Sequence, residues 1–412
     1  MNKKRLKNYA RLIVEKGINV TPGKKYYIDA PCEQYEFVAL VASMLYKKGA
    51  AHVEIIYQDT NVHRASLKYS KVEDLKNFPP YEVEMFDTFQ KERYGRIILK
   101  SPNPNENEGL DIKKITNVQK QRSMIFSPFR KTYMENETEW CIACVPNKKW
   151  AKKVFPSLSP KKAYEALWEA ILNATYVQDD NNAIATWEEH DIALKRRASY
   201  LNEKDFVSLH YTSFNGTDFT VGLVNNYLFE GGSSLNKEGV RFHANMPSEE
   251  IFSMPHNQKA EGVLYATKPL FVNGFLINSF GFRFHEGKVI EVLTNNKEDQ
   301  KVLEELISTD ENASRLGEVA LVSYSSPINQ MGILFYNTLF DENASCHFAL
   351  GQSYKTNMKD SALLSQDELY ALGGNHSHIH VDFMVSDNTT KIVGTTRSGE
   401  EITLMENGEF TF

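Results

Sequence analysis

The chain has 412 residues, of which 42% are hydrophobic and 24% are charged, with 22 Gly and 14 Pro. This composition excludes collagen-like and low-complexity chains, and the length suits about two or three domains of common size. The formal net charge of −6 lacks the basic excess that is typical of nucleic-acid-binding proteins. We therefore expect a folded, soluble protein without a nucleic-acid partner.

The N-terminal segment opens with basic residues, but Arg11, Glu15 and Lys16 interrupt the apolar core that a signal peptide requires. Its apolar spacing instead predicts a helix that Gly17 ends. The longest weakly charged stretch, 267–282, is shorter than the roughly 20 apolar residues that a bilayer requires. We expect a cytoplasmic protein without a membrane partner.

Strand and helix patterns alternate in the first half of the chain, as is typical of an α/β fold. A strand at 25–30, a helix at 34–48 and a strand at 53–57 make a βαβ unit, which predicts a parallel or mixed sheet. The turn between the first strand and the helix, Pro31-Cys32-Glu33, lacks the glycines of a dinucleotide-binding fingerprint. Further patterns predict a strand at 96–99 and helices at 112–124, 161–174 and 184–201.

Strand patterns dominate beyond residue 205. The segments 206–212 and 218–223 flank Asn215-Gly216, which is a strong hairpin signal. We predict an N-terminal α/β domain over residues 1–190 and a C-terminal β-rich α+β domain over residues 191–412. Its predicted elements are strands at 262–266, 274–284, 289–293, 318–324 and 378–385, a helix at 297–307, and a meander from 391 onward.

Four cysteines are too few for a disulfide framework and fit a reducing compartment. The run Trp140-Cys141-Ile142-Ala143-Cys144 resembles a redox-active or zinc-binding pair. It continues into Val145 as an apolar strand, however, where residues three apart face opposite sides of the sheet. The sequence has no second pair of this spacing to complete a zinc site. A structural role is therefore favoured.

A row of polar side chains in the segment 375–384 is the strongest chemical signal. On a strand, His376, His378, His380 and Asp382 would project from one face, and mostly apolar side chains from the other. Imidazole and carboxylate groups are the ligands that Zn, Mn and Co prefer. A solvent-exposed sheet edge is the alternative, but three histidines within five residues favour a metal site.

Other candidates are isolated, and each also has a structural explanation. Glu318 heads an apolar strand and could be its exposed end, while His347 lies among small and apolar residues and could be a hydrogen-bonded core residue. Glu249 and Glu250 follow a pattern that resembles a helix start, where acidic groups stabilise the helix dipole. Spacing alone does not join these residues into one site.

Four blocks of sequence are informative together: 246–252 (Met-Pro-Ser-Glu-Glu-Ile-Phe), Gly317-Glu318, 347–354 and His380-Val381-Asp382-Phe383. They resemble the signature blocks of the thermophilic metalloaminopeptidase family, which includes the aminopeptidase T, aminopeptidase S and PepS types. Their order and spacing are more specific than any one block. The similarity extends over the whole chain, although the N-terminal half matches less specifically.

The resemblance implies two divalent metal ions per subunit, and the mixed oxygen and nitrogen donors suit Zn, Co, Mn or Mg. Matched position by position, the implied metal ligands are Glu250, Glu318, His347, Tyr354, His380 and Asp382. Ser248 stands where the family has threonine and retains the hydroxyl group. His376 and His378 are not ligand positions in the family, so they are candidates for substrate contacts or for groups that support the ligands.

The implied activity is the removal of N-terminal amino acids from peptides by a water molecule that two metal ions activate. The expected catalytic residues are Glu250, Glu318 and Tyr354. If Glu250 is not wholly engaged with metal, it would instead carry a proton from water to the leaving nitrogen, and Glu318 or Asp382 would bridge the metal ions. Tyr354 would bind a metal ion or, as a second role, donate a hydrogen bond to the oxyanion.

Two alternatives compete with the peptidase. A two-metal phosphoesterase or amidase would use the same geometry, but few basic residues flank the candidate ligands, which favours a peptide over a phosphate. A non-catalytic protein of the same fold would be expected to have lost a ligand, and none is lost. The resemblance further implies a homodimer whose subunits each carry the active site in the C-terminal half.

Overall fold

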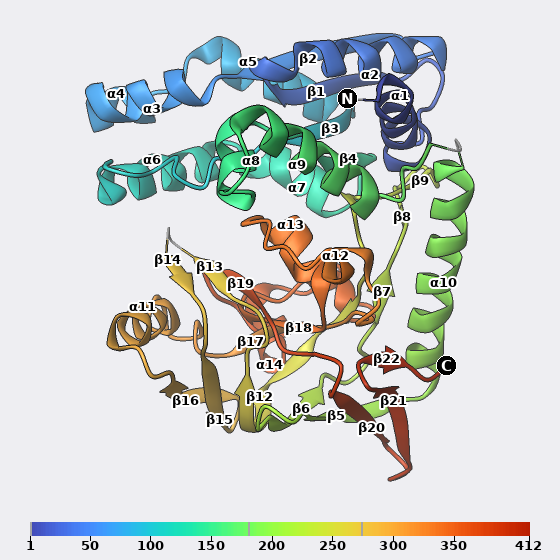
Figure 1. Cartoon of the computed structure of the whole chain (residues 1–412), viewed down its shortest axis with the longest axis vertical. Coiled ribbons are helices and arrows are strands. Elements are labelled where there is room, and N and C mark those ends of the chain that lie inside the picture. Colours follow the sequence, from blue (N-terminus) through green and yellow to red (C-terminus); the bar gives the residue numbers. More distant parts are fainter. Residues whose placement is uncertain (1, 180–181, 273–274) are drawn as a thin grey trace. The chain divides into compact units, whose positions relative to one another are not determined.

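The computed structural model describes residues 2–179, 182–272 and 275–412, and it divides into two compact units (Figure 1). The first unit comprises the residues up to Glu189 together with Ser233–Pro247. The second comprises His190–Gly232 and Ser248–Phe412. The sequence analysis did not anticipate that the chain returns to the first unit at Ser233.

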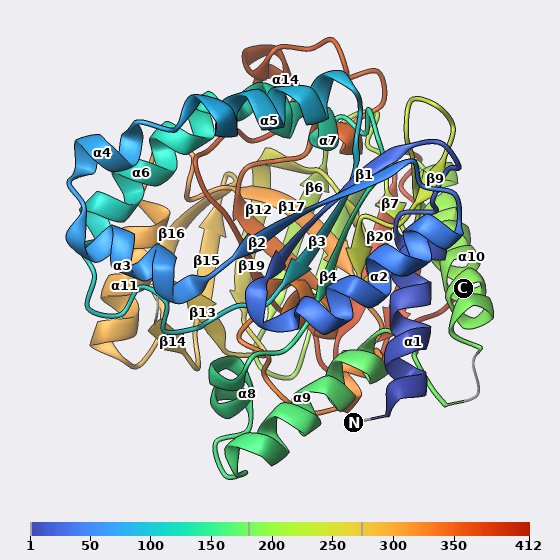
Figure 2. The ribbon, with the colours of Figure 1, turned by 90° about the horizontal axis from the view of Figure 1, so that it is seen from above.

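A parallel sheet forms the centre of the first unit, with the strand order β10-β4-β3-β1-β2. Figure 2 labels four of these strands, β1 to β4. This arrangement confirms the predicted α/β class, and it follows from alternating strands and helices, since parallel neighbours require a crossover between them. The strands are β1 (Lys25–Pro31), β2 (His52–Gln58), β3 (Gly95–Lys100), β4 (Trp140–Cys144) and β10 (Asn245–Met246). A separate pair is formed by β8 (Ser234–Leu235) and β9 (Arg241–Phe242).

The helices of the first unit pack in two groups around this sheet. Tyr9, Phe37 and Trp168 bring α1, α2 and α9 together, with ring centroids 5.6 Å apart for Tyr9 and Phe37. Tyr27 of β1 stacks instead on Phe89 of α5, with centroids 4.6 Å apart. The helices are α1 (Lys3–Leu12), α2 (Tyr35–Lys47), α3 (Thr60–Tyr69), α4 (Val72–Lys76), α5 (Pro80–Lys91), α6 (Ile112–Ile125), α7 (Ser127–Met134), α8 (Lys148–Val154) and α9 (Pro160–Ala174). One π-helical turn (Ile13–Gly17) follows α1 and one 3₁₀ turn (Cys32–Gln34) precedes α2.

The second unit contains two antiparallel sheets, which confirms the predicted β-rich α+β class. The five-stranded sheet has the order β19-β18-β17-β11-β7, and the eight-stranded sheet has the order β16-β15-β12-β6-β5-β20-β21-β22. The first is built from β7 (Glu230–Gly231), β11 (Ile251–Ser253), β17 (Leu316–Leu321), β18 (His347–Gly351) and β19 (His380–Met384). The second is built from β5 (Phe206–Thr212), β6 (Asp218–Leu223), β12 (Pro255–Tyr265), β15 (Gly281–His285), β16 (Lys288–Leu293), β20 (Lys391–Thr396), β21 (Glu401–Glu406) and β22 (Glu409–Phe410).

Short helices and a small hairpin complete the second unit. The helices are α11 (Lys297–Ile307), α12 (Pro327–Gln330), α13 (Thr338–Asp341) and α14 (Gln366–Ala371), with 3₁₀ turns at Glu342–Ala344 and Lys355–Asn357. The hairpin pairs β13 (Leu270–Val272) with β14 (Phe275–Ile277). The helix α10 (Ala183–Glu203) runs through the point at which the chain passes from the first unit to the second.

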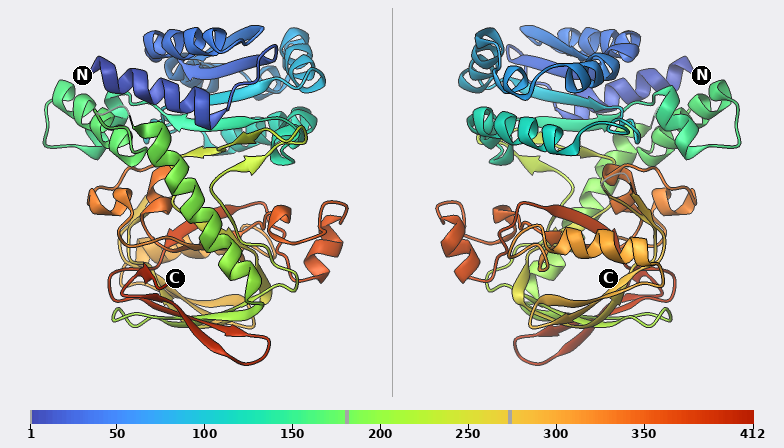
Figure 3. Two further views of the ribbon diagram at one scale, coloured as in Figure 1. Left: turned by 90° about the vertical axis from the view of Figure 1, so that its right-hand side faces the viewer. Right: turned by 90° about the vertical axis from the view of Figure 1, so that its left-hand side faces the viewer.

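Aromatic side chains fill the space between the two sheets of the second unit, which are seen as separate layers in Figure 3. Phe348 of the five-stranded sheet lies 5.1 Å from Tyr211 and 5.4 Å from Phe219 of the other sheet, measured between ring centroids. Phe383 lies 5.4 Å from Phe282. Because side chains alternate along a strand, the neighbours of Phe348 and Phe383 in β18 and β19 must project from the opposite face of the five-stranded sheet.

Most elements predicted from the sequence are present, although several differ in kind or extent: the strands expected over 262–266 and 318–324, for example, are β12 (Pro255–Tyr265) and β17 (Leu316–Leu321). The helix start expected around Glu249 is wrong: the chain forms β10 and then β11, with an extended segment between them. The strand expected from His378 begins at His380. Residues 273–274, at the start of the strand expected over 274–284, lie outside the described residues, and the remainder forms β14 and β15. In the described parts of the chain, no helix has the length and apolar character needed to cross a membrane.

Candidate metal centre

The register of the five-stranded sheet collects four candidate ligands on one face. Glu318 pairs with Ala349, which pairs in turn with Asp382, and pairs opposite each other share a face. His347 lies two residues before Ala349, and His380 lies two residues before Asp382, so both project from that same face. We call this the ligand face. Strand pairing therefore joins three sequence segments that are distant along the chain.

Small residues leave an open space on the ligand face. Ala349 lies between Glu318 and Asp382 in one row, and Ala320 and Gly351 pair with His347 and His380. A row of larger side chains would fill the space between the carboxylates and imidazoles. The alternation of β18 thus places bulky residues in the core and small ones beside the candidate ligands.

A β-bulge at Gly317 turns Glu318 toward the ligand face. Leu316 pairs with Leu350 and Glu318 with Ala349, so Gly317 is an extra residue in β17. In a regular strand Leu316 and Glu318 would share one face, whereas here Leu316 packs in the core. A Cβ atom at Gly317 would lie 2.3 Å from the carbonyl oxygen of Gly351, so only glycine fits this position.

Glu250 reaches the same site from the position just before β11. This strand pairs with β17, and Glu250 directly precedes it. The backbone N–H of Glu249 donates a hydrogen bond of 2.6 Å to the side chain of Asn343, which fixes the extended chain at this point. The Glu249 side chain lies elsewhere, 3.7 Å from Nε2 of His190. These contacts replace the helix start that the sequence pattern suggested.

The side chains form two groups that share Glu318. In the first, Nε2 of His347 lies 3.1 Å from Oε2 of Glu250 and 3.5 Å from Oε1 of Glu318. In the second, Nε2 of His380 lies 3.8 Å from Oε2 of Glu318 and 3.4 Å from Oδ1 of Asp382. The candidate ligand atoms of each group lie within 4.8 Å of one another. Each carboxylate oxygen of Glu318 therefore faces a different imidazole.

Backbone carbonyl groups orient both imidazoles toward the site. Nδ1 of His347 lies 3.2 Å from the carbonyl oxygen of Ser345, and Nδ1 of His380 lies 2.8 Å from that of Gln352. Since a carbonyl oxygen only accepts hydrogen bonds, each Nδ1 must carry a proton and donate it. Nε2 of the neutral ring is then a bare acceptor, which is the form that binds metal ions.

Unsatisfied polar atoms indicate that the first group fits a cation. Oε2 of Glu250 and Nε2 of His347 are buried and have no hydrogen-bond partner within the described part of the chain. With the His347 ring in the neutral form that binds metal, both atoms are acceptors, and they lie only 3.1 Å apart. Buried groups of this kind are costly unless something satisfies them. A divalent cation between them would do so with ligand types that it prefers.

The acidic groups of the site raise the proton affinity of Glu318 and of both imidazoles. Burial raises the pKa of Glu318, and the negative charges of Asp382 and Glu250 add to this effect, although His347 and His380 oppose it. For His380, burial lowers the pKa, but the neighbouring Asp382 and Glu318 have the larger effect and raise it to about 9. For His347, burial likewise lowers the pKa, and Glu250 and Glu318 outweigh burial and raise it well above its usual value. Without cations, protons are the positive charge available to this site.

Tyr354 lies at the edge of this cluster. Its ring centroid is 4.9 Å from that of His380, and the 3₁₀ turn Lys355–Asn357 begins directly after it. Burial raises the pKa of the Tyr354 phenol, and the nearby charges of Glu318 and Asp382 raise it further. The hydroxyl group therefore belongs to the same electrostatic environment as the carboxylates.

Glu342 is a further acidic residue of the site that the sequence analysis missed. Burial raises its pKa well above the usual value, and repulsion from Glu250 and Asp382 contributes. It lies in the 3₁₀ turn Glu342–Ala344, five residues before His347 and in a segment without strand or helix periodicity. Its place in a polar run, Asp341-Glu342-Asn343, could have signalled a ligand, but no pattern distinguishes it from a surface loop.

The histidine row expected at 376–382 is only partly present. Because β19 begins at His380, His376 and His378 precede the strand and are exposed. Nδ1 of His376 lies 3.0 Å from Oε1 of Gln352, and the backbone N–H of His378 donates to Asp310. Neither residue belongs to the two candidate metal groups of the described residues. The metal signal of this segment therefore rests on His380 and Asp382.

Comparisons with known proteins agree along the whole chain. A family model described as thermophilic metalloprotease (M29) matches residues 2–410. The chain is 37% identical over 408 residues to aminopeptidase AmpS of Bacillus subtilis (strain 168), covering 99% of this chain and 98% of that protein. It is 36% identical over 409 residues to aminopeptidase 2 of Geobacillus stearothermophilus, with the same coverage. The solved structure of wild-type AmpT from Thermus thermophilus has a TM-score of 0.92 and 35% identity, covering 100% of both chains.

Proposed function

Because the chain belongs to the thermophilic metalloprotease family M29, we infer that it is a metal-dependent aminopeptidase, a hydrolase that removes N-terminal amino acids from peptides. The curated relatives named above are aminopeptidases, and the match covers nearly their whole length, which supports this activity. The observation that carries the proposal is the pair of ligand groups that share Glu318 on the ligand face.

We propose that the two groups hold two divalent cations. Glu250, Glu318 and His347 would bind one, and Glu318, His380 and Asp382 the other. Tyr354 would complete the ligand set. Four carboxylates (Glu250, Glu318, Glu342 and Asp382) lie close enough for their charges to interact, and cations bound there would offset their mutual repulsion. The two ligand groups support two cations rather than one. The oxygen and nitrogen donors suit Zn, Co, Mn or Mg.

Divalent cations held by these residues would act as Lewis acids on the scissile carbonyl group and would lower the pKa of a bound water molecule. Side chains of the protein itself carry out the proton transfers. Glu250 accepts a proton from the attacking water and delivers it to the leaving nitrogen. Tyr354 binds metal, and as a second role its hydroxyl group donates a hydrogen bond to the developing oxyanion. Both imidazoles are held by backbone carbonyl groups, so their Nε2 atoms need no reorganisation during the reaction.

We further propose that the enzyme works as a homodimer in the cytoplasm. The resemblance to its family supports the dimer, and the small number of cysteines supports a reducing compartment. Size measurement in solution, by light scattering on the purified protein, tests the first point: a mass near one chain would contradict it.

Chelation tests the metal-dependent activity. Treatment with EDTA is expected to abolish hydrolysis of leucine p-nitroanilide, and added Co, Zn or Mn should restore it. An N-acetylated leucine anilide is the matched control substrate and should be resistant, because an aminopeptidase requires a free α-amine. Cleavage of the free anilide by protein shown to be metal-free by elemental analysis would contradict the proposal.

A further inference from the structure

A cavity of about 380 Å³ lies at the carboxyl ends of the parallel strands in the first unit. Residues from the segments that follow four of these strands line it: Gln34 after β1, Thr60 after β2, Ser101 after β3 and Asn147 after β4. This volume is within the range of roughly 300–1,000 Å³ that small-molecule sites occupy. The lining residues all belong to the first unit and the candidate metal ligands to the second, so the two sites share no residue.

Topology makes this edge of the sheet a natural binding position. The chain passes from β1 to β2 on one side and then returns to place β3 on the other side of β1. Because crossovers between parallel strands are right-handed, the connection after β1 and the connection after β3 run in opposite directions along the sheet. The loops that directly follow β1 and β3 therefore diverge from each other. In open parallel sheets, ligands bind in the crevice outside the carboxyl ends of the strands at such a reversal. Sequence analysis excluded a glycine-rich fingerprint here, so the site would hold its ligand with side chains.

Hydrogen bonds between the loops fix the walls of the cavity. Gln34 is 6% exposed, and its Nε2 donates to the carbonyl oxygen of Pro146 at 2.6 Å and to the hydroxyl oxygen of Tyr164 at 2.9 Å. Nδ2 of Asn147 donates to the carbonyl oxygen of Ser101 at 3.1 Å. The Tyr164 hydroxyl accepts from Gln34, and no bond that it donates is found within the described residues. A rigid wall therefore offers an unused donor at Tyr164.

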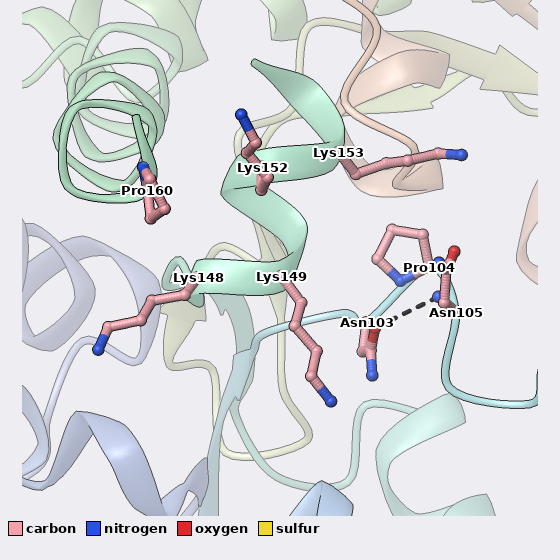
Figure 4. Close-up of a pocket in the computed structure, with 8 residues that line it drawn as sticks. All are labelled: Asn103, Pro104, Asn105, Lys148, Lys149, Lys152, Lys153 and Pro160. Atoms are coloured by element: carbon pink, nitrogen blue, oxygen red, sulfur yellow. Dashed lines mark hydrogen bonds between the residues drawn. The ribbon is translucent and has the colours of Figure 1, made fainter. Parts of the chain in front are cut away.

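Lysine side chains make the mouth of the cavity positive. Lys148 and Lys149 line it and also line an adjoining cavity of about 490 Å³, to which Lys152 and Lys153 contribute (Figure 4). Lys152 donates to the carbonyl oxygens of Pro156 and Leu158 and is thereby engaged. Within the described part of the chain, Lys148 and Lys149 are exposed and form neither an ion pair nor a hydrogen bond. Their positive charges are therefore available to a ligand.

We propose that this cavity binds a small organic phosphate, with Lys148 and Lys149 contacting the phosphate group and the loops after β1 to β4 enclosing the organic part. The two lysine charges equal the double negative charge of a phosphate monoester, and lysine binds phosphate as a point charge. Their ammonium groups point apart in Figure 4, and because both side chains are exposed they can turn toward a bound phosphate. Glu33 is the acidic side chain among the described lining residues, and it is exposed. The volume of about 380 Å³ falls within the range of small-molecule sites, so we expect a ligand that carries an organic part as well as the phosphate group.

Calorimetric titration of the full-length, metal-loaded protein tests the proposal with AMP and glucose 6-phosphate as probes. Adenosine, glucose and inorganic phosphate are titrated separately, because each corresponds to one part of a probe. At least one organic phosphate is expected to bind with a Kd below about 1 mM. The double variant Lys148→Ala/Lys149→Ala should raise this Kd at least about tenfold, the equivalent of losing roughly 1.4 kcal/mol. The matched control Lys3→Ala/Lys4→Ala removes the same charge from an exposed pair in the same unit that lines neither cavity, and should leave the Kd unchanged.

Each contrary result overturns the proposal in a different way. Failure of both organic phosphates to bind would remove the ligand class. Equal affinity for adenosine or glucose would show that the lysines are not used, and equal affinity for inorganic phosphate would show that the organic part is not enclosed. Unchanged affinity in the Lys148→Ala/Lys149→Ala variant would place the phosphate elsewhere, such as the metal centre. The readout is binding, so it is independent of whether the chain hydrolyses peptides.

Discussion

Each unit of the molecule buries a glutamate, and the surroundings of the two differ. Glu139 of the first unit is fully buried, and its Oε2 accepts hydrogen bonds from Lys24 at 2.5 Å, Asn236 at 2.9 Å and Thr138 at 3.2 Å. Glu318 of the second unit is 5% exposed and lies among other acidic groups and two imidazoles. The protein supplies a cation for the first glutamate and gathers more negative charge around the second.

The contrast separates a structural carboxylate from a functional one. A buried charge that has its own ammonium partner and hydrogen bonds holds the fold together, and removing it leaves the partner uncompensated. A buried carboxylate among like charges lowers the stability of the metal-free protein, and a bound cation would offset this loss. Burial alone does not distinguish the two roles, whereas the charge of the neighbours does.

Substituting the two glutamates should change different properties: Glu318→Gln should reduce activity, and Glu139→Gln should reduce stability. The loss of activity is the largest effect expected. Glu318→Gln removes a carboxylate that both ligand groups share, so kcat/KM should fall by about 10³-fold or more, since a metal Lewis acid is worth several kcal/mol. Glu139→Gln should leave kcat/KM nearly unchanged but lower the free energy of unfolding by about 1–3 kcal/mol. Anilide hydrolysis and urea denaturation measure the two quantities.

The exposed Glu401 provides a matched control, because Glu401→Gln makes the same chemical change in the second unit without burial. It should affect neither quantity. If Glu139→Gln lost as much activity as Glu318→Gln, the claim that Glu139 is structural and Glu318 is functional would be contradicted.

His380→Ala sharpens the comparison within the metal centre. This imidazole belongs to the second group alone, so the variant should lose one of two bound cations and keep its fold. Activity should fall by about 10²-fold, corresponding to roughly 3 kcal/mol of lost stabilisation. Elemental analysis with circular dichroism measures metal content and fold. Normal turnover in this variant would remove His380 from the mechanism.

Ala349→Leu asks whether the space on the ligand face is required. The larger side chain would lie between Glu318 and Asp382, and overpacking of this kind costs about 1–3 kcal/mol. We expect metal affinity about tenfold lower, by competition with a chromogenic chelator. Ala349→Gly is the control, since it keeps the space open and should retain the affinity. Equal affinity in both variants would show that Ala349 has no part in shaping the site.

The pH dependence of the metal-free protein should show the smallest effect. Burial, together with repulsion from Glu250, raises the pKa of Glu342 in the folded protein. The folded state then binds more protons than the unfolded state, so stability falls as the pH rises from the unfolded pKa toward the folded one. Glu342→Gln should lessen this fall. Urea denaturation of EDTA-treated protein at several pH values tests it, and identical slopes for wild type and variant would contradict it.

Regular periodicity made much of the fold predictable from the sequence. The hairpin strands around Asn215-Gly216 and the helix Lys297–Ile307 lie at their predicted bounds, because turn residues and amphipathic spacing act locally. The segment around Glu249 misled for the same reason: its local pattern favours a helix cap, but the side chain of Asn343, far along the chain, bonds the Glu249 N–H. Local patterns do not report such distant partners.

The family resemblance identified the candidate ligand positions that the structure brings together, whereas the spacing of these residues along the chain did not show that they form one site. Glu318 faces the site because of the bulge at Gly317, whereas regular alternation would place it with Leu316. His376 and His378 looked equivalent to His380, but the strand begins too late to include them. Glu342 lacks any periodic signal. The metal roles of these residues stay predictions that the experiments above address.

The most direct test of the central claim is a crystal structure of the zinc-loaded enzyme with anomalous scattering measured above the zinc edge. The account predicts two peaks about 3.5–4 Å apart on the ligand face, both in contact with Glu318, with His347 beside one and His380 beside the other. A single peak, or two peaks that do not share Glu318, would contradict it.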